Sequence, residues 1–194
     1  MRNHNKRIVG HLKQRELWFA MLIGGLNFAL LVNLYTVMGF RLIAPPYSLS
    51  ISLTSMIFLC YLSGTISAKL SGRWTQFYSP IKGMVLGTTF SAIGMCIAAY
   101  DSLYAMIIGL LFIGSGAFFT HSLAYAWVSQ KAKVAKATAT ALYLVHYYVG
   151  GSLGGFYLIA CWQYGAWFGV LYGGMVLYGL IYLLCWRLYR YNHQ

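Results

Sequence analysis

Six long apolar segments, joined by short connections, constrain this chain more than any other feature of its sequence. A helix needs roughly 20 apolar residues to cross a bilayer, and each segment reaches that length. None shows the alternation over about 10 residues that marks barrel strands. We therefore predict an all-α, polytopic membrane protein with a six-helix transmembrane bundle. The six predicted spans are Leu17–Ile43, Tyr47–Lys69, Pro80–Ala99, Leu103–Val128, Ala137–Ala160 and Ala166–Arg187.

The charged residues are too few for a soluble domain of this size. They make up 8% of the chain, against 60% hydrophobic residues, whereas soluble domains carry about 25% charged residues. The net charge is nevertheless +12, a balance that can indicate nucleic-acid binding. Here the basic residues form short clusters between apolar runs. The expected partner is therefore the lipid bilayer, and nucleic-acid binding is not expected.

The basic clusters also predict which way the helices run. Of the 14 lysines and arginines, all but Arg41 lie in the N-terminal tail, the second and fourth connections or the C-terminus. Basic residues concentrate on the cytoplasmic side of a membrane protein. We therefore expect both termini in the cytoplasm, with a basic tail at 1–16, a six-helix domain at 17–187 and a C-terminal tail at 188–194.

Glycines recur at the four-residue spacing that lets helix backbones approach closely in lipid. Packing within the chain is the first interpretation, and a dimer face or a sliding surface between moving bundles stays open. A further pair is Gly83 and Gly87. The predicted packing glycines are Gly150, Gly151, Gly154, Gly155, Gly165, Gly169 and Gly173.

Several polar side chains fall inside the predicted spans, where they are costly and therefore mark functional candidates. Arg41 would attract a polar or anionic group at the outer mouth, or would extend to lipid phosphates or bond a backbone carbonyl. The histidines would line a cavity or take a protonatable role, or would be buried and hydrogen-bonded for packing. The candidate cavity residues are Asn27, Asn33, Arg41, His121, Tyr125, Tyr143 and His146.

Carboxylates are missing from the centres of all six spans. Glu16 and Asp101 are the only acidic residues of the chain, and both lie at span margins. A nucleophile, base and orienting acid cannot be assembled without them, so no enzyme is predicted. No cysteine or carboxylate joins the histidines at ligand spacing, so the sequence predicts neither a metal site nor another cofactor.

Three sequence segments resemble a known family. Asn33–Ser50 reads NLYTVMGFRLIAPPYSLS, Thr120–Val128 reads THSLAYAWV, and Ala141–Gly150 reads ALYLVHYYVG. These segments are similar to the C-terminal half of major facilitator superfamily permeases, in the YnfM-like branch of bacterial efflux transporters. The resemblance departs from the family at Gly64–Arg73, where Ala68 holds a position expected to be aspartate in a cytoplasmic loop.

The resemblance implies that the six spans correspond to helices seven to twelve of a twelve-helix fold in the bacterial inner membrane. Its first and fourth spans would line a central cavity, its second and fifth would face the other half, and its third and sixth would lie outermost. A small-molecule substrate and a second six-helix half, or a second copy, are then the expected partners. The alternative is a truncated or relict membrane scaffold or assembly protein that transports nothing.

Overall fold

The computed structural model describes residues 14–192, so most of the predicted basic tail at 1–16 lies outside the described residues. Within 14–192 the secondary structure is all helical, and five helices are long and apolar enough to cross a membrane. This confirms a helical, membrane-spanning fold. The elements are α2 (Arg15–Ile43), α3 (Ile51–Ser55), η1 (Met56–Cys60), α4 (Tyr61–Phe77), α5 (Pro80–Ile97), α6 (Leu103–Lys131) and α7 (Lys136–Asn192).

Local sequence explains where several helices begin and end. Helix α2 stops at Ile43, two residues before the Pro45-Pro46 pair, because proline disfavours helical geometry in the residue before it. The Ser50 hydroxyl accepts a hydrogen bond from the Leu53 amide at 3.3 Å and so caps α3. Helix α5 begins with Pro80, a position where the missing amide hydrogen costs nothing.

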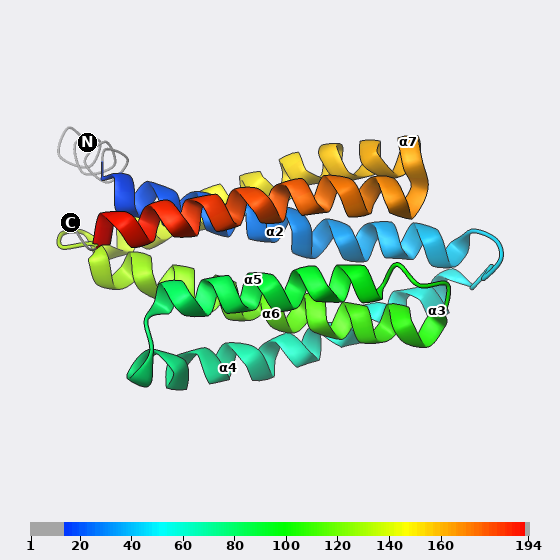
Figure 1. The fold of residues 1–194 in the computed structure, drawn as a ribbon, viewed down its shortest axis with the longest axis horizontal. Helices are drawn as coiled ribbons and strands as arrows, with labels where there is room; N and C mark the ends of the chain where they lie inside the picture. The colour runs from blue at the N-terminus through cyan, green and yellow to red at the C-terminus, as the bar shows by residue number, and fades with distance from the viewer. Residues whose placement is uncertain (1–13, 193–194) are drawn as a thin grey trace.

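Helix α7 is 57 residues long and folds back on itself. Its backbone leaves helical geometry at Gly165 (φ −151°, ψ 21°) and Ala166 (φ 47°, ψ −139°). The two arms, 136–164 and 167–192, then run side by side (Figure 1), and the Tyr157 hydroxyl donates to the Gly173 carbonyl across them at 3.3 Å. A straight helix of this length would measure about 85 Å, so the reversal keeps α7 within the dimensions of the bundle.

Some predicted boundaries were wrong. The second apolar segment becomes helical at Ile51 rather than Tyr47 and stays helical to Phe77. The segment Gly64–Arg73, expected to be a loop, is therefore part of α4. The last helix also continues past Arg187 to Asn192. Hydropathy falls where a helix leaves the hydrocarbon, but its backbone hydrogen bonds need not stop there.

Residues 14–192, the described part of the chain, start and end at the same end of the bundle. A guanidinium nitrogen of Arg15 donates to the Tyr191 hydroxyl at 2.6 Å, and the Lys131 ammonium donates to the Asn192 side chain at 2.7 Å. Figure 1 shows the beginning of α2, the end of α7 and the α4–α5 connection at this end. The described lysines and arginines other than Arg41 belong to the start of α2, the second half of α4, the start of α5, the α6–α7 connection with its flanking residues, and the end of α7. Figure 1 shows these segments toward this end.

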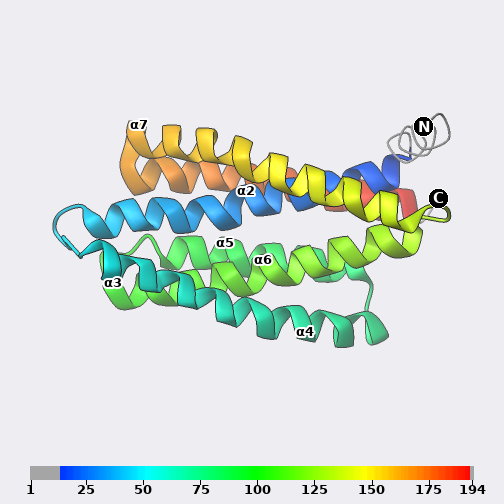
Figure 2. The ribbon, with the colours of Figure 1, turned by 180° about the vertical axis from the view of Figure 1, so that it is seen from behind.

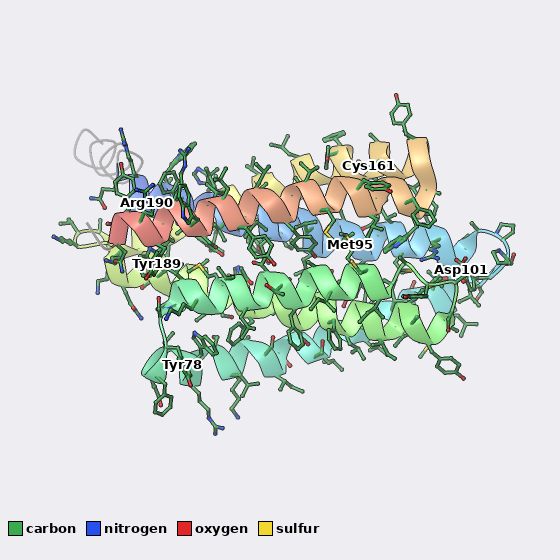
Figure 3. The ribbon with its side chains drawn as sticks, in the orientation of Figure 1. Tyr78, Met95, Asp101, Cys161, Tyr189 and Arg190 are labelled. Carbon is green, nitrogen blue, oxygen red and sulfur yellow. The ribbon has the colours of Figure 1, made fainter. Side chains whose placement is uncertain are left out.

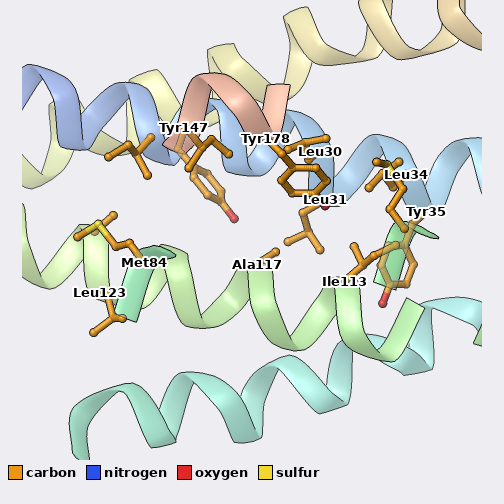
Figure 4. Packing of buried hydrophobic residues seen from close by; sticks show 14 of the residues in the cluster. Leu30, Leu31, Leu34, Tyr35, Met84, Ile113, Ala117, Leu123, Tyr147 and Tyr178 are labelled. Carbon is orange, nitrogen blue, oxygen red and sulfur yellow. The ribbon is translucent and has the colours of Figure 1, made fainter. Parts of the chain in front are cut away.

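The helices form two layers. Helix α2 is the most buried of the five spans. Figure 1 shows α5 and the last arm of α7 nearest the viewer. Figure 2, seen from behind, shows the first arm of α7, α2, α6 and α4 in front. Leu30, Leu31 and Leu34 of α2 pack near Ile113 and Ala117 of the neighbouring helix α6 (Figure 4).

Glycines bring α2 and the first arm of α7 into backbone contact. A Cβ on Gly150 would collide with the backbone of Gly25, and one on Gly154 would lie 2.7 Å from the Ala29 Cα. A Cβ on Gly151 would lie 2.5 Å from the Phe28 ring, and one on Gly155 would lie 3.2 Å from the Asn33 Oδ1. The absence of side chains at these four positions therefore sets the distance between the two helices.

Of the predicted glycines at 165, 169 and 173, only the last two make a close contact. A Cβ on Gly169 would collide with the Cys161 carbonyl, and one on Gly173 would lie 2.5 Å from the Cys161 sulfur. These two glycines therefore join the arms of α7. Gly165 was predicted to pack as well, but a Cβ there would meet nothing within 4 Å, because the residue lies in the reversal itself.

Helices α5 and α6 approach each other at four glycines, of which the four-residue pattern had found only Gly87. A Cβ on Gly94 would lie 2.6 Å from the Gly109 carbonyl oxygen, and one on Gly87 would lie 2.7 Å from the Gly116 carbonyl oxygen. The two glycines of each helix are seven residues apart, so they fall on one face. A search at that spacing would have found both contacts.

Candidate functional site

Aromatic side chains of α2, α4, α6 and the first arm of α7 contact one another, and Figure 2 shows these four segments on one side of the bundle. Successive rings contact one another from Tyr148 and Tyr147 to Phe28 on one side, and from Phe118 to Tyr61 on the other. We call this surface the aromatic face. Its members are Phe28, Tyr61, Phe118, His121, Tyr125, Tyr147 and Tyr148.

His121 lies at the centre of this face. Its Nδ1 is 3.0 Å from the Tyr143 hydroxyl, in a hydrogen bond whose donor depends on the tautomer. Its ring centroid is 4.4 Å from that of Tyr147 and 6.3 Å from that of Tyr125. Tyr143 is fully buried, and its ring passes so close to Gly24 that a Cβ there would lie 2.6 Å away. The buried tyrosine therefore fixes the half-buried histidine above it.

The other side of the face is held by Tyr35. Its hydroxyl donates to the Leu110 carbonyl at 2.7 Å, which ties α2 to α6. Its ring lies 4.4 Å from that of Tyr61 and 5.9 Å from that of Phe58. Tyr35 itself is buried, whereas Tyr61 is partly exposed. A buried tyrosine thus supports an open aromatic residue here, as Tyr143 supports His121.

Such a face can bind an apolar or amphipathic molecule. Aromatic rings offer flat apolar area and stack with other rings, and the imidazole and phenol groups can donate or accept hydrogen bonds. None of the seven members is a carboxylate or a permanent cation. The surface therefore favours shape and aromatic contact over charge recognition.

Arg41 lies at the opposite end of the bundle from the described termini. Its guanidinium donates to the carbonyls of Ala98 at 2.5 Å and Ala99 at 3.2 Å, and it pairs with Asp101 at 2.6 Å. It also lies 5.2 Å from the centre of the Trp167 ring. Only 9% of the residue is exposed. Arg41 thus links the end of α2 to the α5–α6 connection and to the start of the last arm.

The two asparagines of α2 link helices through their amides. Asn27 donates to the Ala117 carbonyl of α6 at 2.9 Å. Asn33 donates to the Ala29 carbonyl of its own helix at 2.8 Å and to the Gly151 carbonyl of α7 at 2.9 Å. Both side chains are buried. Their donors are satisfied by the backbone, as polar groups in lipid require.

His146 lies apart from His121. Its Nδ1 is 2.8 Å from the Leu142 carbonyl of its own helix. It lines an apolar cleft of about 280 Å³ between α2 and the two arms of α7, together with Leu22, Leu26 and Leu177. Of the seven candidates from the sequence, the structure therefore brings together His121, Tyr125 and Tyr143, and it distributes the other four.

Sequence reasoning missed five aromatic members of the face, although their spacing held a signal. Phe118, His121 and Tyr125 follow one another at three and four residues, which is one side of a helix. On α2, Phe28, Val32 and Thr36 form a partly exposed stripe among buried neighbours at the same spacing. The candidates from the sequence were single polar residues, whereas the face is a stripe of aromatic residues. The missed members are Phe28, Tyr61, Phe118, Tyr147 and Tyr148.

The chain is similar to several proteins named as transporters. It is 33% identical over 181 residues to a Bacillus subtilis protein named "Uncharacterized MFS-type transporter YybF". This alignment covers 91% of this chain and 43% of that protein. It is 31% identical over 160 residues to the "Inner membrane transport protein YnfM" of Escherichia coli, covering 82% of this chain and 38% of that protein. An "Uncharacterized transporter" of Buchnera aphidicola is 30% identical over 164 residues. The resemblance to major facilitator (MFS) transporters is therefore confirmed.

The chain spans about two fifths of the length of these relatives. No protein-family model matches it. No solved structure matches it either.

Proposed function

Because the chain is homologous to MFS-type transporters over most of its length, we propose that it forms one six-span half of such a transporter. In this proposal it carries small amphipathic molecules out of the cell across a bacterial inner membrane, together with a second six-helix unit. Transporters of this architecture work by rocking two bundles around a site near the middle of the membrane.

The hairpin of α7 supports six crossings from five helices. Each arm has more than the roughly 20 residues that a span needs, and the reversal falls at the end of the bundle opposite the described termini (Figure 1). Counting the arms separately returns the chain to the side where it began. An even number of crossings is what the resemblance implies for one half of the major facilitator fold.

The uneven charge distribution supports an orientation. The described lysines and arginines lie toward one end, with Arg41 as the exception, and the positive-inside rule assigns that end to the cytoplasm. Arg41 pairs with Asp101, so its charge adds little to the outer side. We therefore assign both termini to the cytoplasm.

The observation that carries the proposal is the aromatic face. The resemblance implies that the first and fourth spans line the transport path, and these are α2 and α6, which carry Phe28, Phe118, His121 and Tyr125. Helix α4 and the first arm of α7 flank them, and α5 and the last arm lie behind (Figures 1 and 2). In this proposal His121 and Tyr125 contact substrate, Tyr143 orients His121, and Asn27, Asn33 and Arg41 support the cavity walls. His146 would lie beside the path.

A second bundle would cover this face. The relatives are more than twice as long as the aligned region, since the alignments cover 38–43% of them. A separate six-helix chain or a second copy of this one could supply the matching half. The competing hypothesis is a membrane scaffold that transports nothing.

Vesicle flux separates the two readings. The chain is reconstituted alone and together with the part of the Bacillus subtilis relative that lies outside the aligned region. Uptake of ethidium, an amphipathic aromatic probe, is followed under an imposed ion gradient. We expect saturable flux only with the second unit, and a loss of about tenfold or more in the His121→Ala variant at unchanged protein level. Flux that never exceeds that of empty vesicles would favour the scaffold.

A further inference from the structure

A basic pocket lies at the end of the bundle where the described chain begins and ends. It has a volume of about 370 Å³ and opens between the first turns of α2 and the last turns of α7. Figure 3 shows Arg190 at this end of α7. The lining residues are Arg15, Phe19, Trp186, Arg187, Arg190 and Tyr191.

The three arginines have no acidic side chain to pair with. The chain contains two acidic residues. Glu16 lies 3.8 Å from Lys131, and Asp101 pairs with Arg41 at the opposite end of the bundle. Three guanidinium charges therefore share one pocket, and no carboxylate of residues 14–192 neutralises them, so the pocket can accept an anion from outside.

The contacts within the pocket orient these groups without neutralising them. Arg15 donates to the Tyr191 hydroxyl at 2.6 Å, and its guanidinium lies 6.0 Å from the centre of that ring. Arg190 lies 5.1 Å from the centre of the Trp186 ring. Phe19 packs edge-on against Tyr191 at 6.0 Å. The result is a set of planar donors above an aromatic wall.

This combination fits a phosphate that carries apolar chains. Guanidinium groups bind phosphate oxygens in a two-pronged geometry, and tryptophan and tyrosine prefer the depth of lipid headgroups. Basic pockets between transmembrane helices bind anionic headgroups. A free phosphate ion would use the arginines but would leave Phe19 and Trp186 without a role.

We infer that this pocket binds the phosphate headgroup of an anionic glycerophospholipid from the leaflet that borders this end of the bundle. Arg15 belongs to α2, and Arg187 and Arg190 belong to the last arm of α7. One bound lipid would therefore tie the first span to the last. The inference concerns a site outside the aromatic face and does not depend on transport.

The test uses the purified full chain, stripped of lipid in a neutral detergent. Phosphatidylglycerol, phosphatidylcholine with the same acyl chains, or inorganic phosphate is titrated in, while the unfolding midpoint is followed and bound lipid is counted by native mass spectrometry. Phosphatidylglycerol should raise the midpoint and stay bound as one tightly held molecule. Phosphatidylcholine and inorganic phosphate at the same concentrations should do neither.

Charge-matched variants locate the site. The double variant Arg187→Gln, Arg190→Gln removes two exposed charges of the pocket, and should weaken phosphatidylglycerol binding about tenfold or more. The control Lys69→Gln, Arg73→Gln removes two exposed charges of α4 on the same side of the membrane, and should change binding less than twofold. Circular dichroism checks the helix content of both, and Arg187→Gln alone repeats the test if the double variant unfolds.

Three results would overturn the inference. Equal weakening in the pocket and control variants would mean general attraction to basic protein. Equal retention of phosphatidylcholine would mean that the headgroup charge is not recognised. Equal protection by inorganic phosphate would mean a site for a free anion rather than for a lipid.

Discussion

Arg41 shows how one side chain can serve two kinds of partner with very different weight. Its guanidinium is 9% exposed and donates to the carbonyls of Ala98 and Ala99 at the end of α5. The Asp101 side chain is 90% exposed, where an ion pair contributes at most about 1 kcal/mol. The buried hydrogen bonds to the two carbonyls should therefore stabilise the protein more than the exposed salt bridge does.

This comparison predicts an asymmetry between two variants. Arg41→Met removes all three contacts and leaves two carbonyls without a donor, so we expect a loss of about 2–3 kcal/mol. Asp101→Asn keeps the carbonyl contacts and should cost under about 1 kcal/mol. Unfolding midpoints of the two proteins in the same detergent check this. An equal or larger effect of Asp101→Asn would show that the ion pair holds this end.

The reversal of α7 places its positive φ on alanine rather than on glycine. Ala166 has φ 47° and ψ −139°, a region in which a side chain costs about 1–3 kcal/mol. Gly165 before it has an extended φ of −151°, and a Cβ there would meet nothing. The glycine thus stands one residue before the position that needs it most.

Replacing alanine by glycine usually destabilises a protein, but the opposite is expected at this reversal. Ala166→Gly should stabilise the protein by about 1 kcal/mol because it relieves the positive φ. Gly165→Ala should be nearly neutral. Thermal unfolding of the two variants and of the parent gives the order directly. A destabilised Ala166→Gly protein would mean that the alanine methyl contributes a contact larger than the strain.

At the scale of the helices, the pairing of α2 with the first arm of α7 depends on glycines, because the missing side chains let the two backbones touch. Gly150 faces Gly25, and Gly154 faces Ala29, both within backbone contact. The side-chain amide of Asn33 also donates a hydrogen bond to the Gly151 carbonyl along the same seam. Lipid supplies no hydrophobic drive between helices, so close packing and hydrogen bonds must hold them together.

A leucine on this seam should separate the helices. Gly154→Leu inserts a side chain where even a Cβ would lie 2.7 Å from the Ala29 Cα, and we expect a large loss of folded, detergent-stable protein. The matched control is Gly179→Leu on the last arm, where a Cβ would meet nothing within 4 Å. Size-exclusion chromatography of both variants measures the folded yield. Similar yields would indicate that the seam can repack.

The helices themselves could be predicted because length and apolarity decide them, but their ends could not. Lys69 and Arg73 suggested that the second span had ended, yet the backbone hydrogen bonds of α4 continue past them, and the Tyr78 amide still donates to the Trp74 carbonyl at 2.9 Å. The helix therefore runs on to Phe77. Hydropathy reports where a helix leaves lipid, whereas its end depends on local hydrogen bonds that composition does not reveal.

At the scale of the whole molecule, the candidate site could be predicted only in part. His121, Tyr125 and Tyr143 were found because polar groups in apolar spans are rare, and the structure joins them. Which asparagine or histidine points toward a neighbouring helix depends on how the helices are rotated, and one chain's spacing does not fix that rotation. Asn27 and Asn33 therefore turned out to donate to backbone carbonyls between helices.

The central claim is that a second bundle covers the aromatic face, and lipid exposure tests it most directly. Tyr148 on this face and Val176 on the last arm are exposed to similar extents, 61% and 58%, and both lie near the middle of their arms. Each is replaced in turn by a spin-labelled cysteine, in a chain whose four native cysteines are changed to alanine. Accessibility to oxygen, which concentrates in lipid, is compared with accessibility to a water-soluble nickel complex in membranes, with and without the second six-helix unit.

We expect the label at position 148 to lose oxygen accessibility and gain nickel accessibility when the second unit is present, as a lipid-facing surface becomes the wall of a watery path. The label at position 176 should remain exposed to oxygen in both states. Unchanged, lipid-like accessibility at position 148, with the second unit shown to be bound, would contradict the account, because the aromatic face would then face lipid and not a transport path.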